Sequence, residues 1–178
     1  MAACARIHPA DRHLECDSPG PILVAGRGSL AGAVAVDALT EIEIARPRDE
    51  VGAFASDPTN VTLWYRNIRS VEWETPPPLA VGSRLRFVAQ FLGRKLRYTY
   101  EVREVDPGSH FVMSTAEGPF PMETSYTWDI AGESRTKMTL RNRGEPSGFA
   151  RFSAPLLERA IRRANQADLR RLKERLEG

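Results

Sequence analysis

The strongest pattern along the chain is an alternation of apolar and polar residues within seven short segments. In one of them, Leu96, Tyr98 and Tyr100 fall on one face, while Arg97 and Thr99 fall on the other. A period of two is typical of a β-strand that buries one of its faces. The predicted strands cover residues 40–46, 68–75, 84–91, 95–105, 111–115, 122–130 and 136–143.

Turn-forming residues separate most of these segments by a few positions. The run of Asp106, Pro107 and Gly108 is the clearest example, because each of these residue types favours turn conformations. Gly93 and Gly132 indicate two further turns. Since strands joined by short turns pair antiparallel, we expect a single antiparallel sheet.

Three helices are predicted around these strands. Pro47 suits the first turn of a helix that ends before Pro58, and a short helical turn covers residues 59–65. From about residue 149, apolar residues recur at steps of three and four, which predicts an amphipathic helix of about 25 residues. Its apolar stripe comprises Leu156, Leu157, Ala160, Ile161, Ala164, Leu169, Leu172 and Leu176.

This order of elements predicts an α+β domain with a seven-stranded curved antiparallel sheet, two short helices and a long C-terminal helix. The long helix must bury its apolar stripe against the concave face of the sheet. A straight helix cannot touch a strongly curved sheet along its whole length, so a gap should remain between them. We interpret this gap as a ligand cavity.

The alternation also predicts which side chains line the cavity. Most are aromatic or Met side chains, which suit rings and acyl chains. The predicted lining comprises Phe87, Phe91, Tyr98, Tyr100, Met113, Met122, Thr124, Tyr126, Trp128, Met138, Asn142, Leu157 and Ile161. Further polar residues that could project inward are Gln90, Thr115 and Arg143. The alternative is that the same side chains form an ordinary filled core.

Composition and charge narrow the possible functions. The chain of 178 residues has 25 basic and 23 acidic side chains, which is too balanced for the basic stripe of a nucleic-acid-binding protein. No segment has the ~18–20 consecutive apolar residues that a membrane span needs. Both cysteines lie in the first 16 residues, so no disulfide framework holds the domain, as is typical of a cytoplasmic protein. Arginines on the long helix alternate with Glu158, Asp168, Glu174 and Glu177, which predicts a solvated face.

Residues 1–37 lack a sustained period and are rich in Ala, Gly and Pro. We predict a disordered or non-core leader there, followed by one domain over residues 38–178. A glycine-rich run at residues 26–32 lacks the βαβ unit that a dinucleotide site requires. Four residues of zinc-binding type have none of the usual zinc spacings, so we expect neither metal nor cofactor. These four are Cys4, His8, His13 and Cys16.

Several short stretches carry a resemblance to a known superfamily. They are residues 42–47, Trp64, and residues 71–73, 81–84, 101–108 and 126–129. With the terminal helix, they make residues 38–177 similar to the START-like (SRPBCC) superfamily, which includes polyketide cyclases and dehydratases, lipid-transfer domains and pollen allergens. The resemblance implies a helix-grip fold that encloses a hydrophobic ligand. It provides no catalytic motif that could be transferred residue by residue.

The leading hypothesis is the binding of a hydrophobic or aromatic molecule, lipid-like or polyketide-like, in the internal cavity. No histidine is predicted on the inward face, because His110 follows a turn at the rim of the sheet. The alternative is a polyketide cyclase or dehydratase, in which Tyr98, Tyr100, Tyr126, Thr124 and Asn142 would orient a poly-keto chain and donate to its enolate. A third possibility is a protein-interaction module, which an exposed apolar patch would favour. The sequence pattern does not bear on the oligomeric state.

Overall fold

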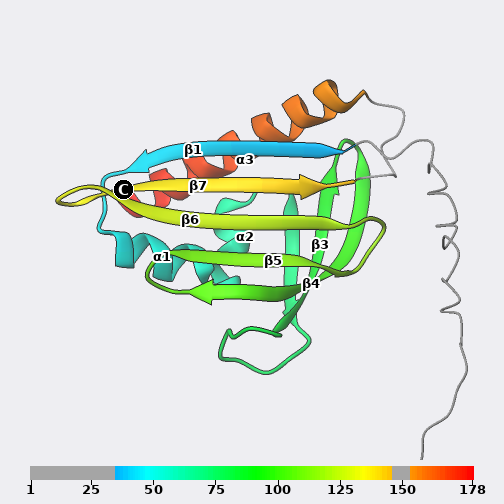
Figure 1. The fold of residues 1–178 in the computed structure, drawn as a ribbon, viewed down its shortest axis with the longest axis horizontal. Helices are drawn as coiled ribbons and strands as arrows, with labels where there is room; N and C mark the ends of the chain where they lie inside the picture. Colours follow the sequence, from blue (N-terminus) through cyan, green and yellow to red (C-terminus); the bar gives the residue numbers. More distant parts are fainter. Residues whose placement is uncertain (1–34, 146–152) are drawn as a thin grey trace, which may run out of the picture. The chain divides into compact units, whose positions relative to one another are not determined.

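The computed structural model describes residues 35–145 and 153–178 of the chain. Its central element is a seven-stranded antiparallel sheet that curves around one side of a long helix (Figure 1). The elements are β1 (Val36–Ile44), α1 (Arg48–Ser56), the 3₁₀ turn η1 (Pro58–Asn60), α2 (Val61–Trp64), β2 (Ile68–Trp73), β3 (Arg84–Phe91), β4 (Arg94–Asp106), β5 (His110–Glu117), β6 (Met122–Gly132), β7 (Arg135–Gly144) and α3 (Ala154–Glu177). The predicted α+β architecture is confirmed.

The sheet has the strand order β1-β7-β6-β5-β4-β3-β2. Strands β2 to β7 therefore form a continuous antiparallel meander, and β1 pairs with β7 at the other edge. The strand β1 begins at Val36, opposite Gly144, so it starts earlier than the pattern predicted. Val36 and Ala38 are buried with Leu157 and Ile161 of α3, and this packing extends the strand. Residues 1–34 of the predicted leader, which include its Cys and His side chains, lie outside the described residues.

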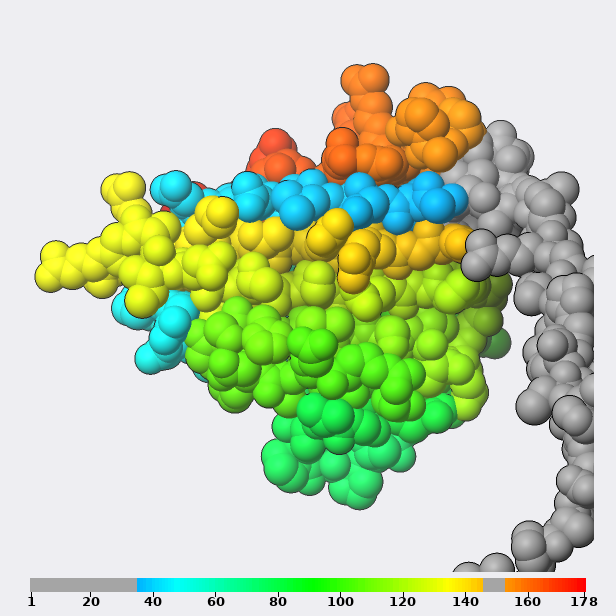
Figure 2. Space-filling model, viewed as in Figure 1, coloured from blue at the N-terminus to red at the C-terminus, as the bar shows by residue number. Residues whose placement is uncertain are grey.

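Irregular pairing in β4 contributes to the curvature of the sheet. The register between β4 and β5 shifts at Thr99/Tyr100 and again between Val102 and Glu104, and such β-bulges bend a strand and increase its twist. Strands β3 and β4 thereby curl away from the plane of β6 and β7 (Figure 1). Side chains of β1, β7, β6 and β5 cover the outer face of the sheet (Figure 2).

Helix α1 closes one end of the inner face of the sheet. Gly52 of α1 lies against Trp128 of β6, and a Cβ atom at residue 52 would come within 2.6 Å of the indole Nε1. The indole N–H of Trp128 donates to the carbonyl oxygen of Pro107 at 3.1 Å. Only glycine allows so close an approach of a helix backbone to an aromatic ring. The contact holds α1 over the part of the inner face that contains Trp128, so this end of the sheet is filled.

Helix α3 lies next to β1 and α2 on the inner side of the sheet. Its C-terminal half buries Leu169, Leu172 and Leu176 in the main core. Its N-terminal half buries Leu157 and Ile161 in a second, smaller cluster. Among the described residues, no helix is long and apolar enough to cross a membrane.

Candidate functional site

A cavity of about 130 Å³ lies between the inner face of the sheet and the N-terminal half of α3. Most of the residues predicted from the sequence line its wall. They are Phe87, Phe91, Tyr98, Tyr100, Met113, Met122, Thr124, Tyr126, Asn142, Leu157 and Ile161. The gap expected between a curved sheet and a straight helix is therefore present, and it is not filled completely by side chains.

The sequence prediction is wrong for Trp128 and Met138. Both side chains are completely buried in the main core, and neither lines the cavity. Alternation places them correctly on the inner face, but α1 and the C-terminal half of α3 fill that end of the sheet. They therefore support the fold, and the cavity lies further along the strands.

The predicted polar residues also divide between the two faces. Thr115 lines the cavity, and its Oγ1 atom accepts from the backbone N–H of Met122 at 3.1 Å. Gln90 and Arg143 are exposed instead, and Arg143 pairs with Glu123 on the neighbouring strand. Strand alternation explains this division, because Gln90 follows the inward Ala89 and Arg143 follows the inward Asn142.

Some residues of the wall were not predicted. The connection after α2 contributes Tyr65 and Asn67, the start of β2 contributes Ile68, and α3 contributes Asn165 and Asp168. The remaining unpredicted residues are Ala89, Leu96, Pro119, Phe120 and Ala164. The helical period contained a usable signal, because Asn165 and Asp168 fall on the same stripe as Leu157 and Ile161. The side chain of Tyr65 follows no period, so nothing in the pattern indicated it.

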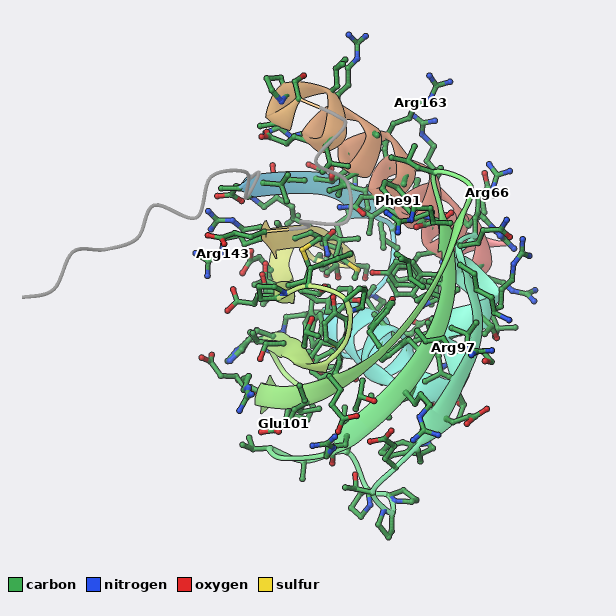
Figure 3. All side chains as sticks on the ribbon, turned by 90° about the vertical axis from the view of Figure 1, so that its right-hand side faces the viewer. Arg66, Phe91, Arg97, Glu101, Arg143 and Arg163 are labelled. Carbon is green, nitrogen blue, oxygen red and sulfur yellow. The ribbon has the colours of Figure 1, made fainter. Side chains whose placement is uncertain are left out.

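Apolar side chains surround one end of the cavity. Phe91 and Leu96 come from the β3–β4 hairpin, and Pro119 and Phe120 come from the β5–β6 turn. Figure 3 shows Phe91 near α3, whereas Arg66, Arg97 and Arg163 project away from the interior. Pro119 is both exposed and part of the wall, so we place the opening of the cavity at this end.

Aromatic rings form the floor of the cavity and hold one another in place. The rings of Phe87 and Tyr98 stack with centroids 5.5 Å apart, and Tyr100 packs edge-on against both, at 5.6 Å and 5.0 Å. On the other side, Tyr126 stacks on Phe111 at 5.7 Å. Such pairs add to the stability gained from area burial. The floor is therefore rigid and mostly apolar.

Hydrogen-bonded side chains cross this apolar wall from the sheet to α3. The hydroxyl groups of Tyr100 and Thr124 lie 3.1 Å apart. The amide of Asn142 donates to Thr124 Oγ1 at 2.8 Å. Asn165 of α3 donates to Asn142 Oδ1, also at 2.8 Å. This series of hydrogen bonds satisfies polar groups that would otherwise be costly to bury, and it connects the helix to residues on β7, β6 and β4.

The four tyrosines of the wall are all neutral hydroxyl groups at physiological pH. Burial raises the pKa of Tyr100 to about 12 and raises the pKa values of Tyr65, Tyr98 and Tyr126 well above their usual range. The hydroxyl groups of Tyr65 and Tyr126 bond to each other at 2.7 Å. The Tyr98 hydroxyl has no hydrogen-bond partner among residues 35–145 and 153–178. The site thus offers hydroxyl groups to a ligand.

The prediction that Asp168 of α3 lies on a solvated face is wrong. Its side chain is only 1% exposed. Its Oδ1 atom accepts from the backbone N–H of Arg66 at 2.9 Å, but its Oδ2 atom has no partner among the described residues. Burial raises the pKa of Asp168 to about 6, despite the opposing effects of that N–H and of Arg171. Perturbed titratable groups in a cavity often mark functional sites.

Among the described residues outside the cavity, no carboxyl group is both buried and raised in pKa. His110 lies at the start of β5, where its Nε2 atom is 3.3 Å from the Glu104 carboxylate, and it is not part of the cavity wall. Within residues 35–145 and 153–178, no cluster of His, Cys, Asp or Glu side chains has the arrangement that a metal ion would need. We therefore take the cavity as the candidate site.

Comparisons with known proteins agree with this architecture. A protein from Thermus thermophilus is 23% identical with a TM-score of 0.66, and the match covers 79% of this chain and 96% of that one. The ZhuI aromatase/cyclase from Streptomyces sp. R1128 is 18% identical with a TM-score of 0.66, over 80% of this chain and 94% of that one. A START superfamily protein from Mycobacterium smegmatis is 15% identical with a TM-score of 0.68, over 79% of this chain and 97% of that one. No curated protein matches the chain. At these identities, the solved structures show the fold alone.

A family model gives the stronger result. The model described as polyketide cyclase / dehydrase and lipid transport matches residues 35–177, which includes every element from β1 to α3. The matched region contains both the curved sheet and the helix that enclose the cavity. The chain therefore belongs to the polyketide cyclase / dehydrase and lipid transport family.

Proposed function

We propose that this protein binds an apolar or aromatic small molecule in the cavity beneath α3. The observation that supports this function is the wall itself, which consists mainly of aromatic and aliphatic side chains with a few hydroxyl and amide groups. Small-molecule sites usually combine an apolar lining with a small number of polar groups that orient the ligand. Burial of apolar ligand surface would supply most of the affinity, at ~25 cal/mol per Å² before the costs of binding.

The size of the cavity restricts what it encloses. Its volume is about 130 Å³, and an apolar protein cavity of roughly 150 Å³ is known to hold one benzene molecule. We therefore propose that one ring, or a short acyl segment, occupies the enclosed part. A longer lipid-like or polyketide-like ligand would extend past Phe91 and Phe120 toward the opening.

Titration with benzene tests this proposal. In wild-type protein, ¹H–¹⁵N spectra should show saturable shifts at amides beside Phe87, Met113 and Ile161, which line the cavity. Ala164→Phe should weaken binding at least tenfold, because Ala164 also lines the cavity and the larger side chain would fill the space that benzene needs.

Ala160→Phe is the matched control. It introduces the same side chain into α3, one turn away, at a residue outside the cavity wall. This variant should bind benzene as the wild type does. Wild-type protein that shows no saturable shift with benzene would disprove the proposed function, and equal weakening in both variants would place the binding site elsewhere.

A second candidate function is catalysis of the cyclase or dehydratase type. The observation in its favour is the hydroxyl group of Tyr98, which lies in the wall beside the Tyr100–Thr124–Asn142 chain and has no partner among the described residues. Neutral hydroxyl donors in an apolar site can stabilise the oxyanion of an enolate. The family description is consistent with this chemistry.

Deuterium exchange at the central carbon of acetylacetone, a small 1,3-diketone, tests the catalytic candidate. If Tyr98 donates to the enolate, the protein should accelerate exchange, and Tyr98→Phe should reduce this acceleration about tenfold or more while benzene still binds. Exchange at the buffer rate with wild-type protein would contradict the candidate. An unchanged rate in Tyr98→Phe would remove Tyr98 from the mechanism.

A further inference from the structure

Asp168 differs from the other described residues of the cavity wall in its charge. Of the described residues that line the cavity, it alone has a side chain that can carry a full charge near neutral pH. The carboxyl group is almost completely buried, and its Oδ2 atom has no hydrogen-bond partner among the described residues. A buried polar atom without a partner is unfavourable for folding. The bond from the Arg66 N–H accounts for the Oδ1 atom, but the fold does not account for the Oδ2 atom.

The groups around Asp168 in the described residues do not supply a partner for this buried acceptor. The backbone N–H of Arg66 occupies only the Oδ1 atom. The guanidinium group of Arg171 donates to the carbonyl oxygen of Leu63 at 3.3 Å, and the side chain of Arg66 projects outward (Figure 3). The remaining titratable groups that act on Asp168 are the neutral hydroxyl groups of Tyr65 and Tyr126.

The Tyr65–Tyr126 pair supplies the complementary donor. When two hydroxyl groups bond to each other, one donates and the other keeps its hydrogen for a third group. The same region of the wall thus presents one free O–H donor and one free carboxylate acceptor. A ligand hydroxyl group can donate and accept at the same time, whereas an ammonium group can only donate. A hydroxyl group is therefore the better match.

We propose that Asp168 accepts a hydrogen bond from a hydroxyl group on the enclosed ring of the ligand, so that the cavity selects hydroxyaromatic molecules over hydrocarbons of the same size. This inference rests on the proposed binding function and names the substrate class of the same site. The Tyr65–Tyr126 pair would donate to the oxygen atom of that hydroxyl group. The ring itself would pack against the aromatic floor formed by Phe87, Tyr98 and Tyr100.

Phenol and toluene are the appropriate probes, because they have nearly the same shape and differ in one hydroxyl group. Their dissociation constants should be measured by NMR titration at pH 8 for wild-type protein, Asp168→Asn and Asp168→Leu. The preference for phenol over toluene should fall about tenfold or more in Asp168→Leu, because a hydrogen bond to a charged group is lost. It should fall less in Asp168→Asn, because the amide oxygen still accepts. Glu174→Leu, an exposed substitution on the same helix, should leave the preference unchanged.

The possible results separate this inference from the proposed function. If toluene and phenol both bind, but with the same preference in all four proteins, the role of Asp168 is disproved and the binding function stands. If neither probe binds the wild type, the binding function itself fails. A second measurement does not depend on any variant: in wild-type protein, phenol should lower the pKa of Asp168 followed by ¹³C NMR, and toluene should not. An Asp168 pKa that phenol leaves unchanged would overturn the inference.

Discussion

Replacing Trp128 with alanine is expected to lower the free energy of unfolding by about 3–5 kcal/mol. The indole ring is completely buried in the main core, where it fills the space between β6 and the backbone of Gly52. Its removal leaves a void and also deprives the carbonyl oxygen of Pro107 of its donor. Urea or guanidinium unfolding of both proteins, followed by circular dichroism, would measure the loss.

Ile130→Ala is the matched control, because Ile130 lies two residues further along the same strand and is 68% exposed. It should cost less than about 1 kcal/mol. A similar loss in both variants would contradict the central position of Trp128 in the core. Since Trp128 lies outside the cavity wall, the milder variant Trp128→Phe should bind benzene as the wild type does.

Asp168→Asn is expected to stabilise the protein at pH 8 by about 2–3 kcal/mol relative to the wild type and to have much less effect at pH 4. In the folded protein, burial raises the pKa of Asp168 from 3.8 to about 6, so the folded state binds the proton more tightly than the unfolded chain. The favourable contribution of the protonated acid is complete below pH 4. In the wild type, this contribution to the free energy of unfolding is lost as the pH rises through about 6. Asparagine does not titrate, so the free energy of unfolding of the variant does not fall for this reason.

Unfolding curves at intervals between pH 4 and pH 8 would reveal this difference. The wild-type free energy of unfolding should fall relative to that of Asp168→Asn across this range, with most of the change before pH 7. Glu174→Gln, an exposed change on the same helix, should follow the wild type. Parallel pH profiles for the wild type and Asp168→Asn would show that the carboxyl group is not held in an unfavourable environment.

The order of the helices and strands can be predicted from the sequence, because each strand has one buried and one exposed face. Tyr98 and Tyr100 alternate with Arg97 and Thr99, and this alternation correctly places the two tyrosines in the cavity wall. A period of two identifies the face on which a side chain lies, but it contains no information about position along the strand. For that reason, the alternation assigns Trp128 to the cavity wall, although α1 covers this residue.

The parts of the site that escaped prediction depend on contacts between distant segments. Tyr65 reaches the wall because α2 packs against α3, and its partner Tyr126 lies 61 residues away along the chain. Asp168 lies seven residues after Ile161 and four before Leu172, which places it on the buried stripe of the helix. Its charge favoured a solvated position, whereas the geometry of the helix required a buried one.

The unequal attachment of the two halves of α3 determines how the cavity could enlarge. Near its C-terminus, the helix is fastened to β1 and to the residue after it, because Glu177 accepts from the backbone N–H of Ala45 at 2.6 Å and Lys173 donates to the carbonyl oxygen of Glu43 at 2.7 Å. The buried part of the smaller cluster under the N-terminal half comprises only Val36, Ala38, Leu157 and Ile161. Four half-buried side chains, Phe91, Leu96, Phe120 and Met122, also pack against this cluster, but the N-terminal half of α3 still rests on fewer fully buried residues than the C-terminal half does. We therefore expect that a ligand wider than one ring would displace the N-terminal half of α3 before the C-terminal half.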